Sequence, residues 1–127
     1  MPAGAREARI KSDIDAEAIS RAVLSSLEDD KAEDILAIDI RGKSSFADML
    51  VVASGRSARH VGALADHLTR KLKEAGVKDV RIEGMPTCDW VLVDAGDVVI
   101  HLFRPEVRTF YNIEKIWAGG AGPNAVS

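Results

Sequence analysis

The sequence predicts a single α/β domain in which about five short strands combine with helices. Short apolar runs bounded by polar or glycine-containing loops are typical of strands, and they are interspersed with stretches whose apolar residues recur at helical spacing. With 127 residues, 46% of them hydrophobic, the chain can bury one core without disulfides or metal ions. We expect this domain to span residues 12–118, between flexible tails at 1–11 and 119–127 that are poor in periodic apolar residues.

The first part of the domain predicts a helix and two strands. Residues 12–15 have the Ser-x-x-acid form of a capping box, so we expect the helix to begin near Ser12 or Asp13. Residues 35–40 and 49–53 are short and mostly apolar, which predicts two strands buried on both faces. The apolar stripe of the helix consists of Ile19, Ala22, Val23 and Leu27.

The middle of the chain carries the clearest helical pattern. Ser57 is suited to cap a helix N-terminus, and Gly76 is suited to end that helix. Residues 80–83 then predict a short strand, followed by a turn at 84–86. The apolar positions of the helix are Val61, Leu64, Ala65, Leu68 and Leu72.

The last third predicts a β-hairpin and a final helix. Residues 90–94 and 98–103 flank an Ala-Gly turn, which is the pattern of two antiparallel strands. We expect this hairpin to lie at an edge of the sheet. Pro105 fits the first turn of a helix that runs to about Trp117.

Aromatic residues concentrate in the same third and include candidates for recognition. Trp90 begins a strand, where a large aromatic side chain either fills the core or anchors a partner. His101 alternates with apolar residues and is either a structural histidine or part of a binding site. In the final helix, Phe110 and Trp117 fall on an apolar stripe, whereas Tyr111 falls off it and is the better recognition candidate.

The charge pattern argues against a protein that coats nucleic acid. The formal net charge is −3, whereas phosphate binding relies on Lys and Arg clustered across a face. Any RNA contact should therefore be local. Arg56, Arg59 and His60 stand at a predicted helix N-terminus, where they either contact an RNA phosphate or acidic partner or form an ordinary solvated helix start.

Motifs for catalysis and cofactors are incomplete. Gly42-Lys43-Ser44 lacks the glycine that a phosphate-binding loop requires five positions earlier, where Ala37 stands. Nucleotidyl transfer needs paired acids to hold metal ions, and Asp48 is the only acid near Ser44 and Ser45. We therefore expect no enzyme activity, no cofactor and no small-molecule substrate.

The remaining metal, redox and membrane signals are also weak. His60 and His67 lie two turns apart on one helix, too far to share a metal ion without other ligands. Cys88 is the single cysteine and has no basic neighbour in sequence to activate its thiol. Neither a signal peptide nor a membrane-spanning run is visible, so we expect a cytoplasmic protein.

Two long blocks of sequence resemble the signatures of the Iojap-like family. The first block comprises DIRGKSSFAD at residues 39–48 and ASGRSARHV at 53–61. The second comprises DWVLVDAGDVVIHLF at residues 89–103 and RTFYNIEKIW at 108–117. The resemblance covers residues 13–117 in order and without evident gaps, which makes it specific.

The resemblance implies a translational repressor. Such a factor binds protein fourteen of the large ribosomal subunit, sterically prevents the small subunit from joining, and so silences ribosomes under nutrient limitation. It implies a nucleotidyltransferase-like fold without the catalytic acids, in which a mixed sheet is flanked by helices. It also implies a homodimer when the factor is free of the ribosome.

We expect the site to be a protein-binding surface anchored by Trp90, with acidic residues facing a basic partner. Peripheral ribosomal RNA contacts would come from the arginines near residue 57. Two alternatives remain open: a nucleotidyltransferase-like enzyme, and a ribosome-assembly or RNA-binding factor. The enzyme would use Ser44, Ser45, Asp48 and Asp94. The residues expected at the surface are Trp90, Val91, His101, Tyr111, Asp48, Asp94 and Glu114.

Overall fold

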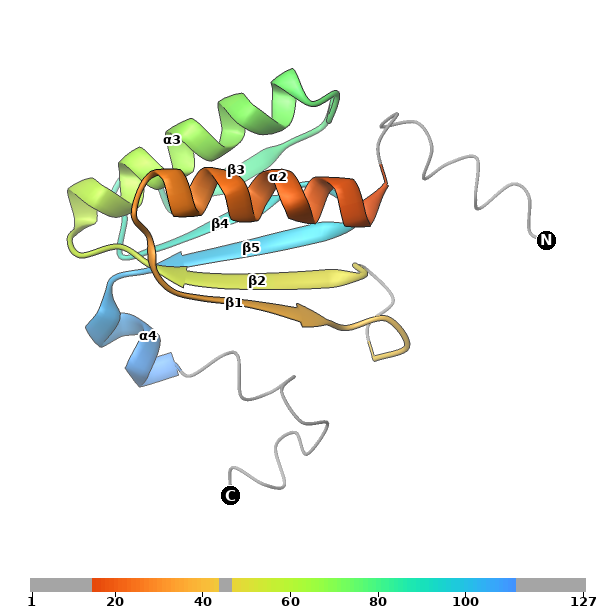
Figure 1. Cartoon of the computed structure of the whole chain (residues 1–127). Coiled ribbons are helices and arrows are strands. Elements are labelled where there is room, and N and C mark those ends of the chain that lie inside the picture. Colours follow the sequence, from red (N-terminus) through yellow and green to blue (C-terminus); the bar gives the residue numbers. More distant parts are fainter. Residues whose placement is uncertain (1–14, 44–46, 112–127) are drawn as a thin grey trace.

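Five strands form one mixed sheet in the computed structural model, which describes residues 15–43 and 47–111, without the side chains of 110 and 111. The predicted tails and the end of the final helix therefore lie outside the described residues. Figure 1 shows the arrangement. The helices are α2 (Ala16–Asp29), α3 (Ala58–Glu74) and α4 (Pro105–Tyr111). The strands are β1 (Glu33–Asp39), β2 (Met49–Ser54), β3 (Arg81–Glu83), β4 (Trp90–Asp94) and β5 (Val98–Phe103).

The strand order across the sheet is β1-β2-β5-β4-β3. Strands β2 and β5 run parallel, and the other neighbours are antiparallel. This confirms the predicted α/β fold with a mixed five-stranded sheet flanked by helices. The prediction that the hairpin lies at an edge is wrong, because β5 is central and β3 covers the outer side of β4.

Strand β1 also differs from its prediction as a strand buried on both faces. It forms one edge of the sheet, it begins at Glu33 rather than at Ile35, and most of its residues are exposed. Its pairing with β2 is interrupted by a register shift between Glu33 and Leu36. By contrast, β2 is almost entirely buried, as predicted, since it has strands on both sides and apolar neighbours on both faces.

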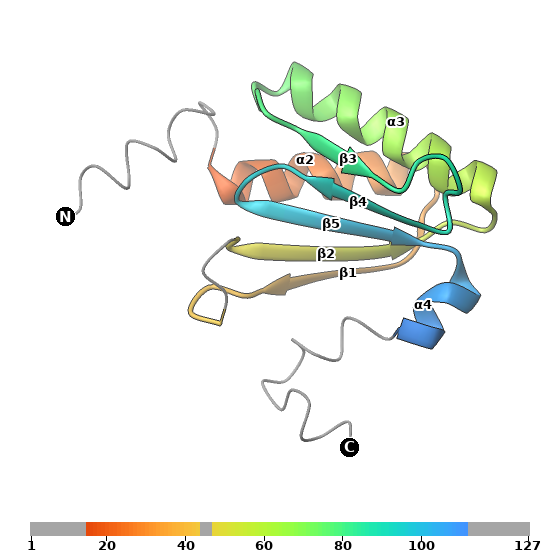
Figure 2. The ribbon, with the colours of Figure 1, turned by 180° about the vertical axis from the view of Figure 1, so that it is seen from behind.

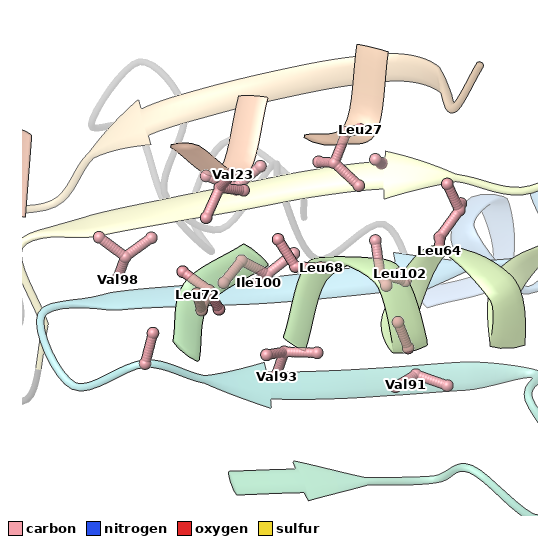
Figure 3. Packing of buried hydrophobic residues seen from close by; sticks show 14 of the residues in the cluster. Val23, Leu27, Leu64, Leu68, Leu72, Val91, Val93, Val98, Ile100 and Leu102 are labelled. Carbon is pink, nitrogen blue, oxygen red and sulfur yellow. The ribbon is translucent and has the colours of Figure 1, made fainter. Parts of the chain in front are cut away.

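Helices α2 and α3 pack side by side on one face of the sheet (Figures 1 and 2). The stripe of α3 predicted from the sequence is fully buried, and Figure 3 shows three of its leucines over β4 and β5. Ser57 Oγ accepts a hydrogen bond from the backbone N–H of His60, which caps the helix as predicted. At the other end, Gly76 and Val77 donate to the carbonyls of Lys73 and Leu72, the two bonds of a Schellman motif.

Helix α2 begins later than predicted. Asp15 caps it by accepting a hydrogen bond from the N–H of Ala18 at 2.9 Å, so the cap is Asp15 rather than Ser12. Residues 12–14 lie outside the described residues. The predicted stripe is confirmed at Ile19, Val23 and Leu27, which are buried against the sheet.

The opposite face of the sheet carries a second, smaller apolar cluster. We call this face the open face, because α2 and α3 both lie on the other side (Figure 2). Within the described residues, the helical contribution to this cluster is Val107 of α4. The buried members of the cluster are Ile40, Ala47, Leu50, Val52, Val99 and Phe103.

Candidate interaction surface

Residues paired in register across the sheet share a face, so the strand register orders the side chains of the open face into three rows. In the middle row, His101 of β5 lies between Val52 of β2 and Leu92 of β4. Acidic residues end all three rows or stand next to their ends. From β1 towards β3 the rows are Glu33, Ser54, Phe103 and Trp90; Leu36, Val52, His101, Leu92 and Glu83; and Ile38, Leu50, Val99, Asp94 and Arg81.

Three rings of the first two rows form an aromatic cluster, defined by Trp90, His101 and Phe103. Trp90 lies opposite Phe103 in the β4–β5 ladder, with ring centroids 5.0 Å apart. His101 stacks on Phe103 with centroids 6.0 Å apart and an interplanar angle of 10°. Trp90 also reaches diagonally to His101, at a centroid distance of 5.8 Å. The cluster therefore ties β4 and β5 together on the open face.

A hydrogen bond fixes the chemistry of the histidine. Trp90 Nε1 donates to His101 Nδ1 at 2.9 Å. Because an indole N–H can only donate, Nδ1 must be the unprotonated nitrogen and the ring proton resides on Nε2. Burial lowers the pKa of His101 to about 4. His101 is therefore neutral at physiological pH.

The aromatic cluster belongs to a partly exposed apolar surface. Phe103 is fully buried, whereas Trp90 and His101 are half-buried. Leu92 of β4 is also half-buried, and Leu36 of edge strand β1 is 38% exposed. Rings and aliphatic side chains of this kind, accessible on one face of a sheet, can pack against a protein partner.

Two of the predicted acidic residues, Asp48 and Asp94, lie towards one end of this surface. Asp94 shares a face with Trp90 and Leu92, and its Oδ1 accepts a hydrogen bond from the N–H of Gly96 in the hairpin turn. Asp48 directly precedes β2, where its N–H donates to the carbonyl of Asp97. The structure thus brings both acids to the β4–β5 turn, at the end away from Trp90.

Val91 was expected at the surface, and the structure contradicts this. Its side chain is fully buried under α3 in the main core (Figure 3). The reason is strand alternation: Trp90 and Leu92 face one way, so Val91 must face the other. Two further candidates, the side chain of Tyr111 and the whole of Glu114, lie outside the described residues.

His60 was a candidate for binding anions, but its ring holds two helices together. Its Nδ1 accepts a hydrogen bond from the N–H of Arg56, and its Nε2 donates to the carbonyl of Asp30, both at 2.9 Å. Both ring nitrogens are therefore used within the helix layer. Arg56 and Arg59 are exposed and stay candidates for a peripheral anion contact.

A histidine–carboxylate pair joins α3 to the end of α2. His67 Nδ1 lies 2.7 Å from Asp30 Oδ2, but no group of three or more potential metal ligands forms anywhere in the described ranges. Ser44 and Ser45 lie outside those ranges. Within the same ranges, no helix has the length and apolar character needed to cross a membrane.

Sequence reasoning missed an ion pair beside the aromatic cluster. Arg104 Nε donates to Asp89 Oδ1 at 2.8 Å, and the backbone N–H of Arg104 donates to the carbonyl of Asp89. The hairpin register contained the signal, because these residues flank the Trp90–Phe103 pair. Arg108 was also missed, and it donates to the carbonyl of Asp34 and to Ser54 Oγ, which fixes α4 against β1 and β2.

Comparison with known proteins identifies the relatives of this chain. The family described as "Ribosomal silencing factor during starvation" matches residues 13–125. Ribosomal silencing factor RsfS from Zymomonas mobilis is 49% identical and covers 94% of this chain and 90% of its own length. A crystal structure of a Chromobacterium violaceum protein aligns with a TM-score of 0.80 at 45% identity, covering 84% of this chain and 88% of that one.

A more distant relative carries a name of another kind. The mouse protein "Mitochondrial assembly of ribosomal large subunit protein 1" is 37% identical over 75% of this chain. The match covers 43% of the mouse protein, so this chain is similar to less than half of that longer protein.

Proposed function

The chain belongs to the ribosomal silencing factor family, and we propose that it represses translation by binding protein fourteen of the large ribosomal subunit. In this proposal the bound factor sterically prevents the small subunit from joining, and it acts under nutrient limitation. It works by occupancy, without enzyme activity or a cofactor, and in the cytoplasm where ribosomes engage messenger RNA.

The observation that carries the proposal is the aromatic cluster on the sheet face opposite α2 and α3, in which Trp90 and His101 are half-buried. A standard protein interface buries about 800 Å² on each partner around an apolar centre. One face of a five-stranded sheet offers a surface of that order. Trp90 is the expected aromatic anchor, with His101 and Leu92 beside it.

Electrostatics favours a basic partner on this face. The three rows contain the acids Glu33, Glu83 and Asp94 against one cation, Arg81, and the whole chain has a net charge of −3. Proteins that pack against ribosomal RNA commonly need basic surfaces, and complementary charge speeds and orients their encounter with acidic partners. Asp48 and Asp94 would face basic groups of the ribosomal protein.

The proposal is tested by capture of purified large subunits combined with a subunit-joining assay. We expect wild-type protein to bind and to inhibit joining, and Asp94→Arg to weaken both effects. Asp66→Arg is the matched control, because it makes the same charge change on the exposed side of α3. If wild-type protein binds and joining proceeds normally, the silencing proposal is wrong. Equal binding by Asp94→Arg and wild type would show that Asp94 does not face basic groups of the ribosomal protein.

Two further parts of the proposal concern other contacts. We propose that the free protein forms a homodimer, which sedimentation without ribosomes will detect. We also propose that Arg56 and Arg59 make a peripheral contact to ribosomal RNA, since both are exposed beside a helix N-terminus. Replacing both arginines by alanine should then reduce the salt dependence of binding to large subunits while leaving most of the affinity.

The name of the mouse relative favours assembly of the large subunit as a second candidate function. The two functions differ in the ribosomal particle on which the protein acts. A silencing factor binds mature large subunits and blocks joining, whereas an assembly factor is required for immature particles to mature. Deleting the gene and profiling the particles by sedimentation separates these outcomes, because accumulation of immature particles follows from the second function alone.

A further inference from the structure

His101 occupies an unusual place for a polar side chain. It lies in the middle row of the open face, directly between Val52 of β2 and Leu92 of β4. Its neighbours in the aromatic cluster are Trp90 and Phe103. Placing a polar ring among apolar groups is unfavourable unless its nitrogens form hydrogen bonds. An apolar side chain at this position would lose less favourable hydration on burial than the imidazole ring of His101 does.

One of the two ring nitrogens is satisfied inside the chain. Trp90 Nε1 donates to His101 Nδ1 at 2.9 Å, which leaves the ring proton on Nε2. The stacking of His101 on Phe103, with nearly parallel planes, fixes the orientation of the ring. The Nε2–H group therefore has a set direction and lies on the opposite side of the ring from Trp90.

The second ring nitrogen of His101, Nε2, differs from Nδ1 in its hydrogen bonding. Within residues 15–43 and 47–111, with the side chains of 110 and 111 left aside, no oxygen accepts a hydrogen bond from His101 Nε2. The ring is only half-buried, so this N–H can reach solvent or a partner. A buried donor that loses water without gaining an acceptor is costly, so a partner that covers the open face must supply an acceptor there.

We propose that Trp90 holds His101 as a neutral Nε2–H donor, and that this donor binds a carbonyl oxygen of the protein that covers the open face. A carbonyl fits better than a carboxylate, because Glu83 and Asp94 already place negative charge on the same face. Trp90 then acts as a positioning residue as well as an apolar anchor. The identity of the partner rests on the proposed function, whereas the state of His101 does not.

The state of the ring is measured in the free, full-length protein by ¹⁵N NMR of the histidine side chains. We expect His101 to show a protonated Nε2 and an unprotonated, hydrogen-bonded Nδ1 at pH 7. Trp90→Phe keeps an aromatic ring but removes the donor, so the preference for this tautomer should weaken. A protonated Nδ1 in the wild-type protein overturns the proposal.

The docking half of the proposal is measured with three proteins and purified large subunits. His101→Phe keeps a ring but loses the donor, and we expect it to weaken binding by about tenfold, as loss of one buried hydrogen bond does. His101→Gln offers both an acceptor to Trp90 and an N–H donor, so it should restore most of the affinity. Urea unfolding of each variant checks that the fold is retained.

The outcomes separate this proposal from the proposed function. If wild type and His101→Phe bind large subunits equally, the donor role is wrong and the silencing function stands. If wild-type protein does not bind large subunits, the proposed function and the docking half of this proposal both fail, and the NMR result alone decides the state of His101.

Discussion

Acid should destabilise this protein through His101 at pH values well above those that protonate most carboxyl groups. The pKa of His101 is lowered by burial from 6.5 to about 4, so between these values the unfolded chain binds a proton that the folded chain does not. Stability therefore rises with pH in this window. The contribution of His101 is fully present above pH 6.5 and is lost as the pH falls towards 4.

The size of the effect follows from the shift. At about 1.4 kcal/mol per pKa unit, lowering the pH from 7 to 5 should remove about 2 kcal/mol, and lowering it to 4 about 3 kcal/mol. These values are upper limits, because a half-buried ring keeps some contact with water. The geometry supports the direction independently: a protonated Nδ1 has no lone pair, so protonation breaks the hydrogen bond from Trp90.

The assay is urea unfolding of wild type and His101→Phe at pH 7 and pH 5, followed by far-ultraviolet circular dichroism. Other titrating groups change in both proteins, so the difference between the two pH dependences isolates His101. We expect wild type to lose more stability than the variant over this interval, by up to about 2 kcal/mol. Equal losses in the two proteins would refute the assignment of a buried neutral histidine.

Three further substitutions test the fold. Gly84→Ala should destabilise by about 3 kcal/mol or more, because at φ +93° its Cβ would lie 2.2 Å from a β4 carbonyl oxygen, whereas Gly96→Ala, also at positive φ but in open space, should cost about 1 kcal/mol in thermal unfolding. His60→Ala should cost about 2 kcal/mol in urea unfolding, because it removes the bond to the Asp30 carbonyl at the end of α2 and the bond from the Arg56 N–H, and Arg59→Ala should cost less than about 0.5 kcal/mol. Leu68 of α3 is fully buried, so Leu68→Ala should cost about 2–5 kcal/mol of unfolding free energy. A smaller loss would mean that the core relaxes around the cavity.

Local sequence signals predicted the parts of the fold that are determined locally. Helix α3 follows from its cap at Ser57, its apolar stripe and Gly76, and all three act within a few residues of the chain. The β4–β5 hairpin follows from two apolar runs around a short turn. Such signals do not contain the lateral order of strands. Residues 35–40 are as apolar as a central strand, and only the tertiary fold makes β1 an edge.

The candidate site shows the same limit and one missed opportunity. Alternation along a strand already requires Trp90 and Val91 to face opposite ways, so the burial of Val91 could have been predicted from the position of Trp90. The bond from Trp90 to His101 could not, because it joins diagonal rather than directly opposite positions of the ladder. Its formation depends on side-chain rotamers and on the twist of the sheet.

On the proposed mechanism, salt and His101 act on different steps of binding. The acids of the open face attract a basic partner before contact, and added salt screens this attraction, so the association rate should fall as ionic strength rises. The Nε2–H of His101 acts only when the surfaces are in close contact, so His101→Phe should raise the dissociation rate instead. Binding kinetics of both proteins at two salt concentrations measures the two steps separately. If His101→Phe slowed association and left dissociation unchanged, the histidine would be acting before contact, and a short-range hydrogen bond could not explain its role.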